Sequence, residues 1–94
     1  MAEGNWAKDV IAVRSERIEV TVDANSFKDL GTINSLISFP TGYSIEGITL
    51  MTESNGNCIP FLRYYGGGIS VFVRNFYSSQ ITTGIYIRAI FVKQ

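Results

Sequence analysis

The sequence has no histidine and a single cysteine, Cys58, among its 94 residues. Catalytic triads need histidine, and most zinc sites need histidine or several cysteines, so both kinds of site are excluded. One cysteine cannot form a disulfide within the chain, and its apolar neighbour Ile59 indicates a buried structural thiol rather than a nucleophile. The candidate carboxylate pair for glycoside hydrolysis, Glu46 and Glu53, has an odd spacing that puts the two on opposite faces of a strand unless a bulge resets the phase. We therefore expect no enzyme, no catalytic residue, no cofactor and no metal.

Charged residues are scarce, at 17% of the sequence against the usual quarter. This low charge density is a first hint of an oligomer, although a compact β-domain rich in Ser, Thr and Asn explains it equally well. No acidic residue follows Glu53, and the later charges are Arg63, Arg74, Arg88 and Lys93. Four spaced cations without a lysine cluster argue against a nucleic-acid surface, so we expect no nucleic-acid partner. The asymmetry predicts ion pairs between early and late strands.

Long apolar runs are missing as well. No stretch approaches the length of a membrane span, and the first six residues lack the basic-then-apolar order of a signal peptide. We expect no membrane insertion and no signal peptide.

Alternation of apolar and polar residues fills most of the chain and predicts strands rather than helices. The expected strands cover about residues 15–23, 32–39, 44–53, 57–65, 68–75 and 81–93. Phe27 and Leu30, in the loop after the first strand, are expected core residues. About six evenly spaced strands predict an all-β fold, a small antiparallel β-sandwich (jelly-roll-like) or a small barrel. Residues 1–14 are expected to be a lead-in segment, and residues 15–94 a single β-sandwich domain.

Turn-forming residues separate the expected strands. Pro40 ends the second strand at a turn, and Gly47 lies where the apolar period slips, which predicts a β-bulge. Asn55-Gly56 predicts a hairpin turn between the third and fourth strands. Pro60 predicts that the fourth strand is an edge strand or carries a bulge.

The last strand is apolar on both faces. Residues 76–80 join it to the preceding strand, and the two strands are expected to form a terminal hairpin. One face carries Ile85, Ile87, Ala89 and Phe91 and the other carries Tyr86, Arg88, Ile90 and Val92. Because a two-sided apolar strand needs cover on both sides, we expect a second sheet over the first face and another subunit over the second. The second group is therefore the expected oligomer interface.

Several pieces in a fixed order form a distinctive pattern. They are the strand Ile18-Glu19-Val20-Thr21-Val22, the turn Phe39-Pro40-Thr41-Gly42-Tyr43, the run Ile69–Asn75 followed by Ser78-Ser79, and the closing run Ile87–Lys93. Their order over residues 16–93 resembles that of the small all-β modules at the C-termini of bacteriophage tail-fibre and baseplate receptor-binding proteins. The chain departs from them at Phe91, where such modules often carry leucine followed by tyrosine, and at Phe76-Tyr77, which lengthen the loop.

The resemblance implies a homotrimeric virion component, in the phage tail or on the particle surface, made in the host cytoplasm. Its implied role is attachment to the host surface, with a cell-wall glycan and other virion proteins as partners. Two alternatives remain: a purely structural virion protein, such as a capsid decoration or tail accessory, and a monomeric bacterial carbohydrate-binding domain. The chain is either a complete small protein or a module of a longer one.

Aromatic residues are the expected glycan contacts, because sugar C–H groups stack on aromatic rings. Tyr64 and Tyr65 lie beside the glycine turn, and Phe76 and Tyr77 lie in the loop before the last strand. Packing in the core or at a subunit interface is the competing role for each of the four.

Overall fold

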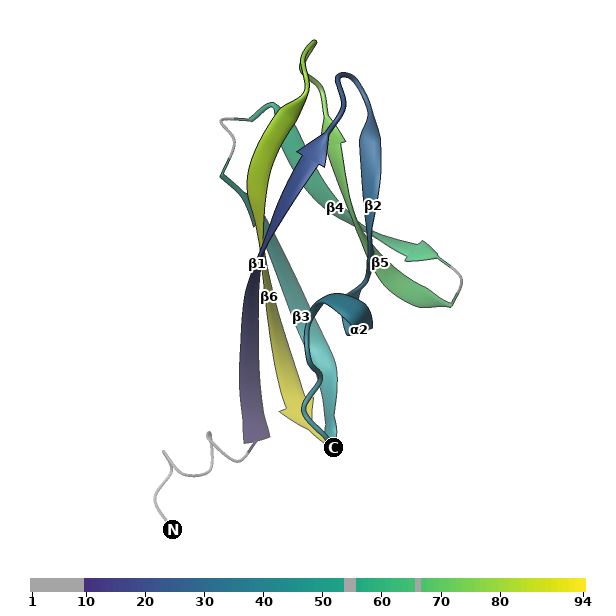
Figure 1. Cartoon of the computed structure of the whole chain (residues 1–94). Coiled ribbons are helices and arrows are strands. Elements are labelled where there is room, and N and C mark those ends of the chain that lie inside the picture. The colour runs from purple at the N-terminus through teal and green to yellow at the C-terminus, as the bar shows by residue number, and fades with distance from the viewer. Residues whose placement is uncertain (1–9, 54–55, 66) are drawn as a thin grey trace.

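The computed structural model describes residues 10–53, 56–65 and 67–94, and these residues are mostly β-structure (Figure 1). The strands are β1 (Ile11–Val22), β2 (Phe27–Thr32), β3 (Tyr43–Thr52), β4 (Cys58–Tyr65), β5 (Gly68–Asn75) and β6 (Ile81–Lys93). One helical turn, α2 (Ile33–Leu36), follows β2. The all-β prediction is confirmed.

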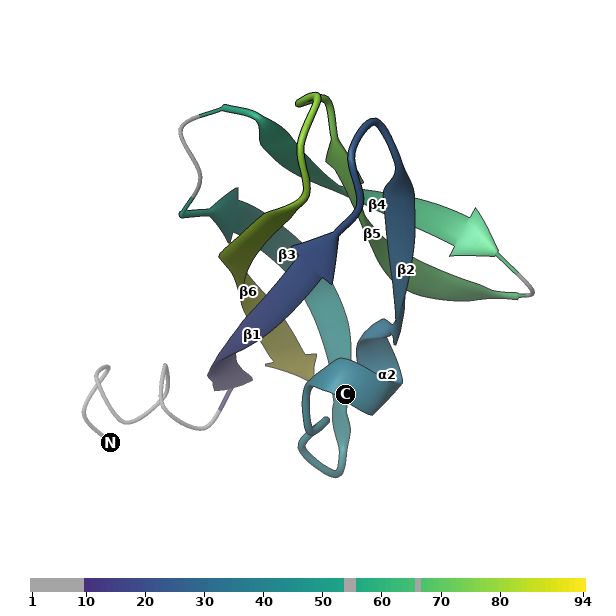
Figure 2. The same ribbon diagram turned by 45° about the horizontal axis from the view of Figure 1, so that its top comes forward.

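The strands form two three-stranded antiparallel sheets, in the orders β1-β6-β3 and β2-β5-β4. We call them the β6 sheet and the β5 sheet after their central strands. Figure 2 shows the two sheets on opposite sides of the molecule, with α2 near one end. Within the described chain β4 and β5 are the one pair of consecutive strands that share a sheet, and every other connection crosses from one sheet to the other.

Both predicted hairpins are wrong. β5 and β6 are the central strands of different sheets, so residues 76–80 cross between sheets. β3 pairs with β6, whereas β4 pairs with β5, so Asn55-Gly56 does not join a hairpin; residues 54–55 lie outside the described residues. The physical reason is that a central strand has both edges hydrogen-bonded and its inner face opposite the other sheet, and the apolar strands β5 and β6 occupy these two positions.

The predicted strand at residues 32–39 is also wrong. β2 ends at Thr32, just after Gly31, whose φ of 113° favours glycine. Residues 33–36 then form α2, and Ile33 and Ile37 are both buried in the core. A spacing of four residues suits a helical turn, and the sequence pattern alone does not separate it from a short strand.

The two core residues expected near β2 have different outcomes. Phe27 begins β2 and is 57% exposed, so its predicted core position is wrong. Leu30 is half-buried and packs against the core, as expected. β2 is an edge strand, and the Phe27 side chain points to the outer side of its sheet, where the other sheet cannot cover it.

Other local predictions are confirmed. The register of β3 against β6 shifts between Ile45 and Gly47, as a bulge requires. Pro60 lies on β4, which is an edge strand. Cys58 is buried, as predicted, and forms no disulfide within the chain.

β1 begins at Ile11, earlier than predicted. Ile11 pairs with Val92 in the β6 sheet, so residues 11–14 of the expected lead-in belong to a strand. Residues 1–9 lie outside the described residues. The run from Val10 to Val13 does not alternate, which is why period-two reasoning did not detect the start of the strand.

The core lies between the two sheets. β6 contributes Ile85, Ile87, Ala89 and Phe91, the face predicted to be inward, and all four are fully buried. Val71 and Val73 of β5 face them from the other sheet. Phe39 packs edge-on against Phe91, with ring centroids 4.9 Å apart. Each sheet therefore has one face in the core and one outer face available for binding.

Candidate functional site

Asn75, at the end of β5, fixes the loops at one end of the molecule. Its side chain is fully buried, and its amide nitrogen donates to the backbone oxygens of Val22, Asp23 and Ser79 at 2.9–3.2 Å. Its amide oxygen accepts a hydrogen bond from the backbone N–H of Tyr77 at 2.8 Å. One side chain thus ties the end of β1 to the loop between β5 and β6.

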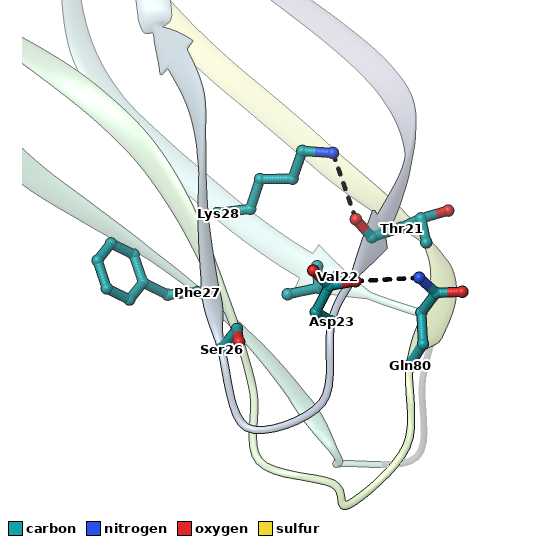
Figure 3. A pocket seen from close by; sticks show the side chains of 7 residues that line it. All are labelled: Thr21, Val22, Asp23, Ser26, Phe27, Lys28 and Gln80. Carbon is teal, nitrogen blue, oxygen red and sulfur yellow. Dashed lines mark hydrogen bonds between the residues drawn. The ribbon is translucent and has the colours of Figure 1, made fainter.

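A groove of about 420 Å³ opens beside these loops (Figure 3). It is lined by Thr21, Val22, Asp23, Ser26, Phe27, Lys28 and Gln80. The Asp23 carboxylate accepts a hydrogen bond from the Gln80 amide at 3.0 Å, and the Lys28 ammonium donates to the Thr21 carbonyl at 3.3 Å. The ring of Phe27 points away from these polar groups (Figure 3). The groove is therefore polar and lies along the open edge between β1 and β2.

The outer face of the β5 sheet carries an aromatic cluster. Phe61 of β4 stacks on Phe72 of β5 with centroids 5.4 Å apart, and Phe27 of β2 contacts the same ring at 6.0 Å. The Arg63 guanidinium lies 5.9 Å from the centre of that ring. Phe72 is consequently only 4% exposed, although it points away from the core.

The outer face of the β6 sheet carries an apolar stripe. We define the stripe as Ile11 and Val13 of β1 with Ile90 and Val92 of β6, which are paired in register. Ile11, Val13 and Ile90 are each about two-fifths exposed, and Val92 is half-buried. The residues predicted as an interface do share this face, since Tyr86 and Arg88 precede Ile90 on the same side of β6 and are exposed.

An ion-pair cluster lies further along the same face. Arg17 of β1 binds Glu53 in a bidentate pair at 2.8 and 3.0 Å, and the Tyr86 hydroxyl donates to Glu53 at 2.6 Å. Gly84 lies beneath them, because a Cβ there would come within 2.5 Å of the Glu53 carboxylate. Three strand segments are joined across the outer face in this way.

The cluster shifts the pKa values of its members. The hydrogen bond from Arg17, followed by that from Tyr86, lowers the pKa of Glu53 to about 2. The bond to Glu53 in turn raises the pKa of Tyr86. Among the described residues Arg17 forms ion pairs with Glu53 and with Glu19, and neither of these joins an early acid to a late cation.

The structure does not bring the four predicted glycan contacts together. Tyr64 and Tyr65 lie at one end of the β4–β5 ladder, whereas Phe76 and Tyr77 follow the opposite end. Tyr64 is 83% exposed and lines an apolar cleft of about 180 Å³ with Leu62, Arg63 and Ile69. The side chain of Tyr65 lies outside the part of the chain that the structure describes. Phe76 and Tyr77 are exposed, and the Arg74 guanidinium lies 5.2 Å from the Phe76 ring.

Sequence reasoning missed the groove and the aromatic cluster. The alternation of Ile59, Phe61 and Arg63 signals an outer apolar face on β4, and it matches the phase of Phe72 once the two strands are paired. The groove residues Asp23, Lys28 and Gln80 carry no comparable signal. They meet because a turn and a crossing loop adjoin in space.

No protein family, curated protein or solved structure matches this chain. Within residues 10–53, 56–65 and 67–94 no cluster of three or more His, Cys, Asp or Glu side chains is placed to hold a metal ion. No helix in these ranges is long and apolar enough to cross a membrane. The surfaces themselves are thus the basis for a functional proposal.

Proposed function

We propose that this chain is a non-catalytic attachment module of a bacteriophage virion. In this proposal the two sheets form a small β-sandwich that assembles as a homotrimer through the outer face of the β6 sheet. The assembly binds a glycan of the host surface and contacts other virion proteins. The observation that carries the proposal is the apolar stripe of Ile11, Val13, Ile90 and Val92.

The stripe is unusual for the outer face of a monomer. An antiparallel sheet with one face on the core normally presents polar residues on the other face. Here Val13 and Ile90 lie directly opposite each other on paired strands. Ile11 and Val92 form the next pair on the same face, nearer the start of β1. Covering these four side chains would gain about 25 cal/mol for each Å² of apolar surface removed from water. In a trimer with a threefold axis, the same side chains of all three copies can meet around the axis, so the stripes would cover one another.

The number of subunits has a different basis. The stripe supports association, and the resemblance to tail-fibre modules supports three copies. The ion-pair cluster of Arg17, Glu53 and Tyr86 adds an ordered group of polar side chains to the same face. Polar groups at an interface contribute more to the register and specificity of subunit packing than to its affinity.

Glycan binding is proposed for the end of the molecule where the loops meet. Phe76 and Tyr77 are exposed there, and Gln80 of the same loop lines the polar groove. The backbone N–H of Asn25 donates to the Tyr77 carbonyl at 3.0 Å, which joins this loop to the turn between β1 and β2. Exposed rings beside anchored polar groups are suited to saccharides.

A glycan array probed with the fluorescently labelled chain tests this function. Retention on bacterial surface glycans is expected, and Phe76→Ala and Tyr77→Ala are expected to weaken it. Phe61→Ala, on the aromatic cluster of the other sheet face, is the matched control and should leave it unchanged. A chain with the mass of a trimer that is retained on no glycan would contradict the attachment role and leave a purely structural virion part. A monomer retained on the array would indicate a carbohydrate-binding domain instead.

A further inference from the structure

We infer that the groove between β1 and β2 binds a single neutral pyranose ring. This inference rests on the proposed function, because it names the site and the class of sugar through which the module would hold a glycan. The site differs from the four aromatic residues expected from the sequence. It is formed by the end of β1, the following turn, the start of β2 and Gln80 (Figure 3).

The size and the lining of the groove suit a sugar. Its volume of about 420 Å³ lies within the range of about 300–1,000 Å³ that is usual for small-molecule sites. Sugar hydroxyls donate and accept hydrogen bonds, so a site for them needs both kinds of group. The Asp23 carboxylate only accepts, the Lys28 ammonium only donates, and the Gln80 amide does both. Val22 lines the groove but is almost fully buried, so the surface offered to a ligand is mainly polar.

The charges of the groove favour a neutral ligand. Asp23 and Lys28 are the two ionisable residues that line it, and their charges cancel. A uronic acid would be attracted by Lys28 and repelled by Asp23, and an amino sugar the reverse. A charged sugar would therefore lose part of its hydration in the groove without a net electrostatic gain. A neutral hexose or N-acetylhexosamine meets neither repulsion.

The polar groups of the groove are already held in place. The Gln80 amide donates to the Asp23 carboxylate, and the Ser26 hydroxyl donates to the Ala24 carbonyl at 3.0 Å. Asn75 fixes the backbone of Asp23 from below. Because these groups are ordered before a ligand arrives, less entropy is lost on binding. The site is nevertheless open, so a single groove is expected to bind weakly, and three grooves in a trimer would raise the avidity.

Nuclear magnetic resonance of the ¹⁵N-labelled full chain tests the inference. The chain is titrated separately with glucose, galactose and N-acetylglucosamine, and with galacturonic acid and glucosamine as charged counterparts. At least one neutral sugar is expected to cause saturable shifts in the backbone amides of residues 21–28 and 77–81. The charged counterpart should bind about tenfold more weakly. Shifts centred on Tyr64 and Ile69, or no saturable shift with any neutral sugar, would overturn the inference.

Two substitutions separate this site from the alternatives. Asp23→Ala and Gln80→Ala each remove a side-chain partner from the groove and should weaken binding about tenfold or more. Tyr64→Ala, at the cleft on the far end of β4, is the control and should leave the affinity unchanged. The dispersion of the amide spectrum confirms that each variant is folded.

The outcome also distinguishes the inference from the proposed function. If Asp23→Ala and Gln80→Ala both bind the glycan array as well as the original chain, the groove is not the site, although the attachment role stands. If the original chain binds no arrayed glycan but a neutral monosaccharide still shifts residues 21–28, the groove stands and the attachment role fails.

Discussion

Asn75 is the residue on which the arrangement of the loops depends most. A buried side-chain amide is stable only when its hydrogen-bonding groups have partners, and Asn75 satisfies its own by bonding to the end of β1 and to the loop between β5 and β6. The loop that carries Phe76, Tyr77 and Gln80 is positioned by these bonds. A residue far inside the protein thereby determines the geometry of the proposed binding end.

Substitution of Asn75 should destabilise the whole fold. Asn75→Ala leaves the carbonyl of Val22 without this partner in a buried environment, and the carbonyl of Ser79 and the N–H of Tyr77 without it in a partly buried one. We expect a loss of about 2–3 kcal/mol in the free energy of unfolding, measured by urea denaturation at one fixed protein concentration. Asn34→Ala, at an exposed position of α2, is the control and should change stability by less than about 0.5 kcal/mol. Equal effects at the two positions would show that the Asn75 bonds contribute little.

At the scale of the element, β5 shows how an outward side chain can become buried. Its inner face meets the core, and its outer residue Phe72 is covered by Phe61 and Phe27 from the two neighbouring strands. β5 therefore carries apolar contacts on both faces, although only one of them belongs to the core between the sheets.

Removing the Phe72 ring should destabilise the fold strongly, although the ring lies outside the core between the sheets. Phe72→Ala is expected to lower the free energy of unfolding by about 3 kcal/mol, because an almost fully buried phenyl ring is lost. Phe76→Ala removes another phenyl ring, at an exposed position, and should lower the free energy of unfolding by less than about 1 kcal/mol. Chemical denaturation of both variants measures the difference. A small effect at Phe72 would mean that the aromatic cluster adds little to stability.

The ion-pair cluster links the strands of the β6 sheet in a pH-dependent way. Because the pKa of Glu53 in the folded chain, about 2, lies below its ordinary value of 4.5, the ionised carboxylate stabilises the folded state. That stabilisation is fully present above about pH 4.5 and is lost as the pH falls toward 2. Glu53→Gln should remove this part of the acid dependence, and a ¹³C titration of the Glu53 carboxyl measures its pKa directly. A pKa near 4.5 in the original chain would contradict the cluster.

Gly84 provides a sharper variant of the same experiment. Gly84→Ala places a methyl group where the Arg17 and Glu53 side chains meet, and these flexible ends must move apart. The pKa of Glu53 should then rise toward 4.5 while the fold remains intact.

Much of the strand arrangement follows from the sequence, and the pairing of strands does not. Alternation located the four later strands to within about two residues, because a half-buried strand imposes a period of two. The inward set from Ile85 to Phe91 was predictable for the same reason. The choice of sheet was not, because Asn55-Gly56 and the crossing loop at residues 76–80 resemble local turns, and only the burial of whole strands selects their partners.

The candidate sites show the same division. The outward group Tyr86, Arg88 and Ile90 was predictable because it lies on one strand. The contributions of Ile11 and Val13 depend on the pairing of β1 with β6, which the sequence does not state. The groove combines Asp23 with Gln80, residues far apart in the chain, so it could be found only from the folded structure.

At the scale of the whole molecule, both outer faces carry exposed apolar side chains. The β5 sheet covers Phe72 by contacts within the chain but leaves Phe27 and Ile59 exposed, and the β6 sheet leaves Ile11 and Ile90 exposed. We propose assembly through the β6 sheet because its exposed aliphatic side chains lie side by side on paired strands, in register. Exposed apolar patches of this kind commonly mark protein interfaces.

The native mass in solution tests this central claim most directly. Size-exclusion chromatography with light scattering, at two protein concentrations, should give three times the chain mass of 10.4 kDa. Ile90→Glu puts a charge in the stripe and should yield monomers, whereas Ile59→Glu makes the same change on the outer face of the β5 sheet and should leave the trimer intact. A monomer at both concentrations, or a trimer dissociated by Ile59→Glu but not by Ile90→Glu, would contradict assembly through the β6 sheet.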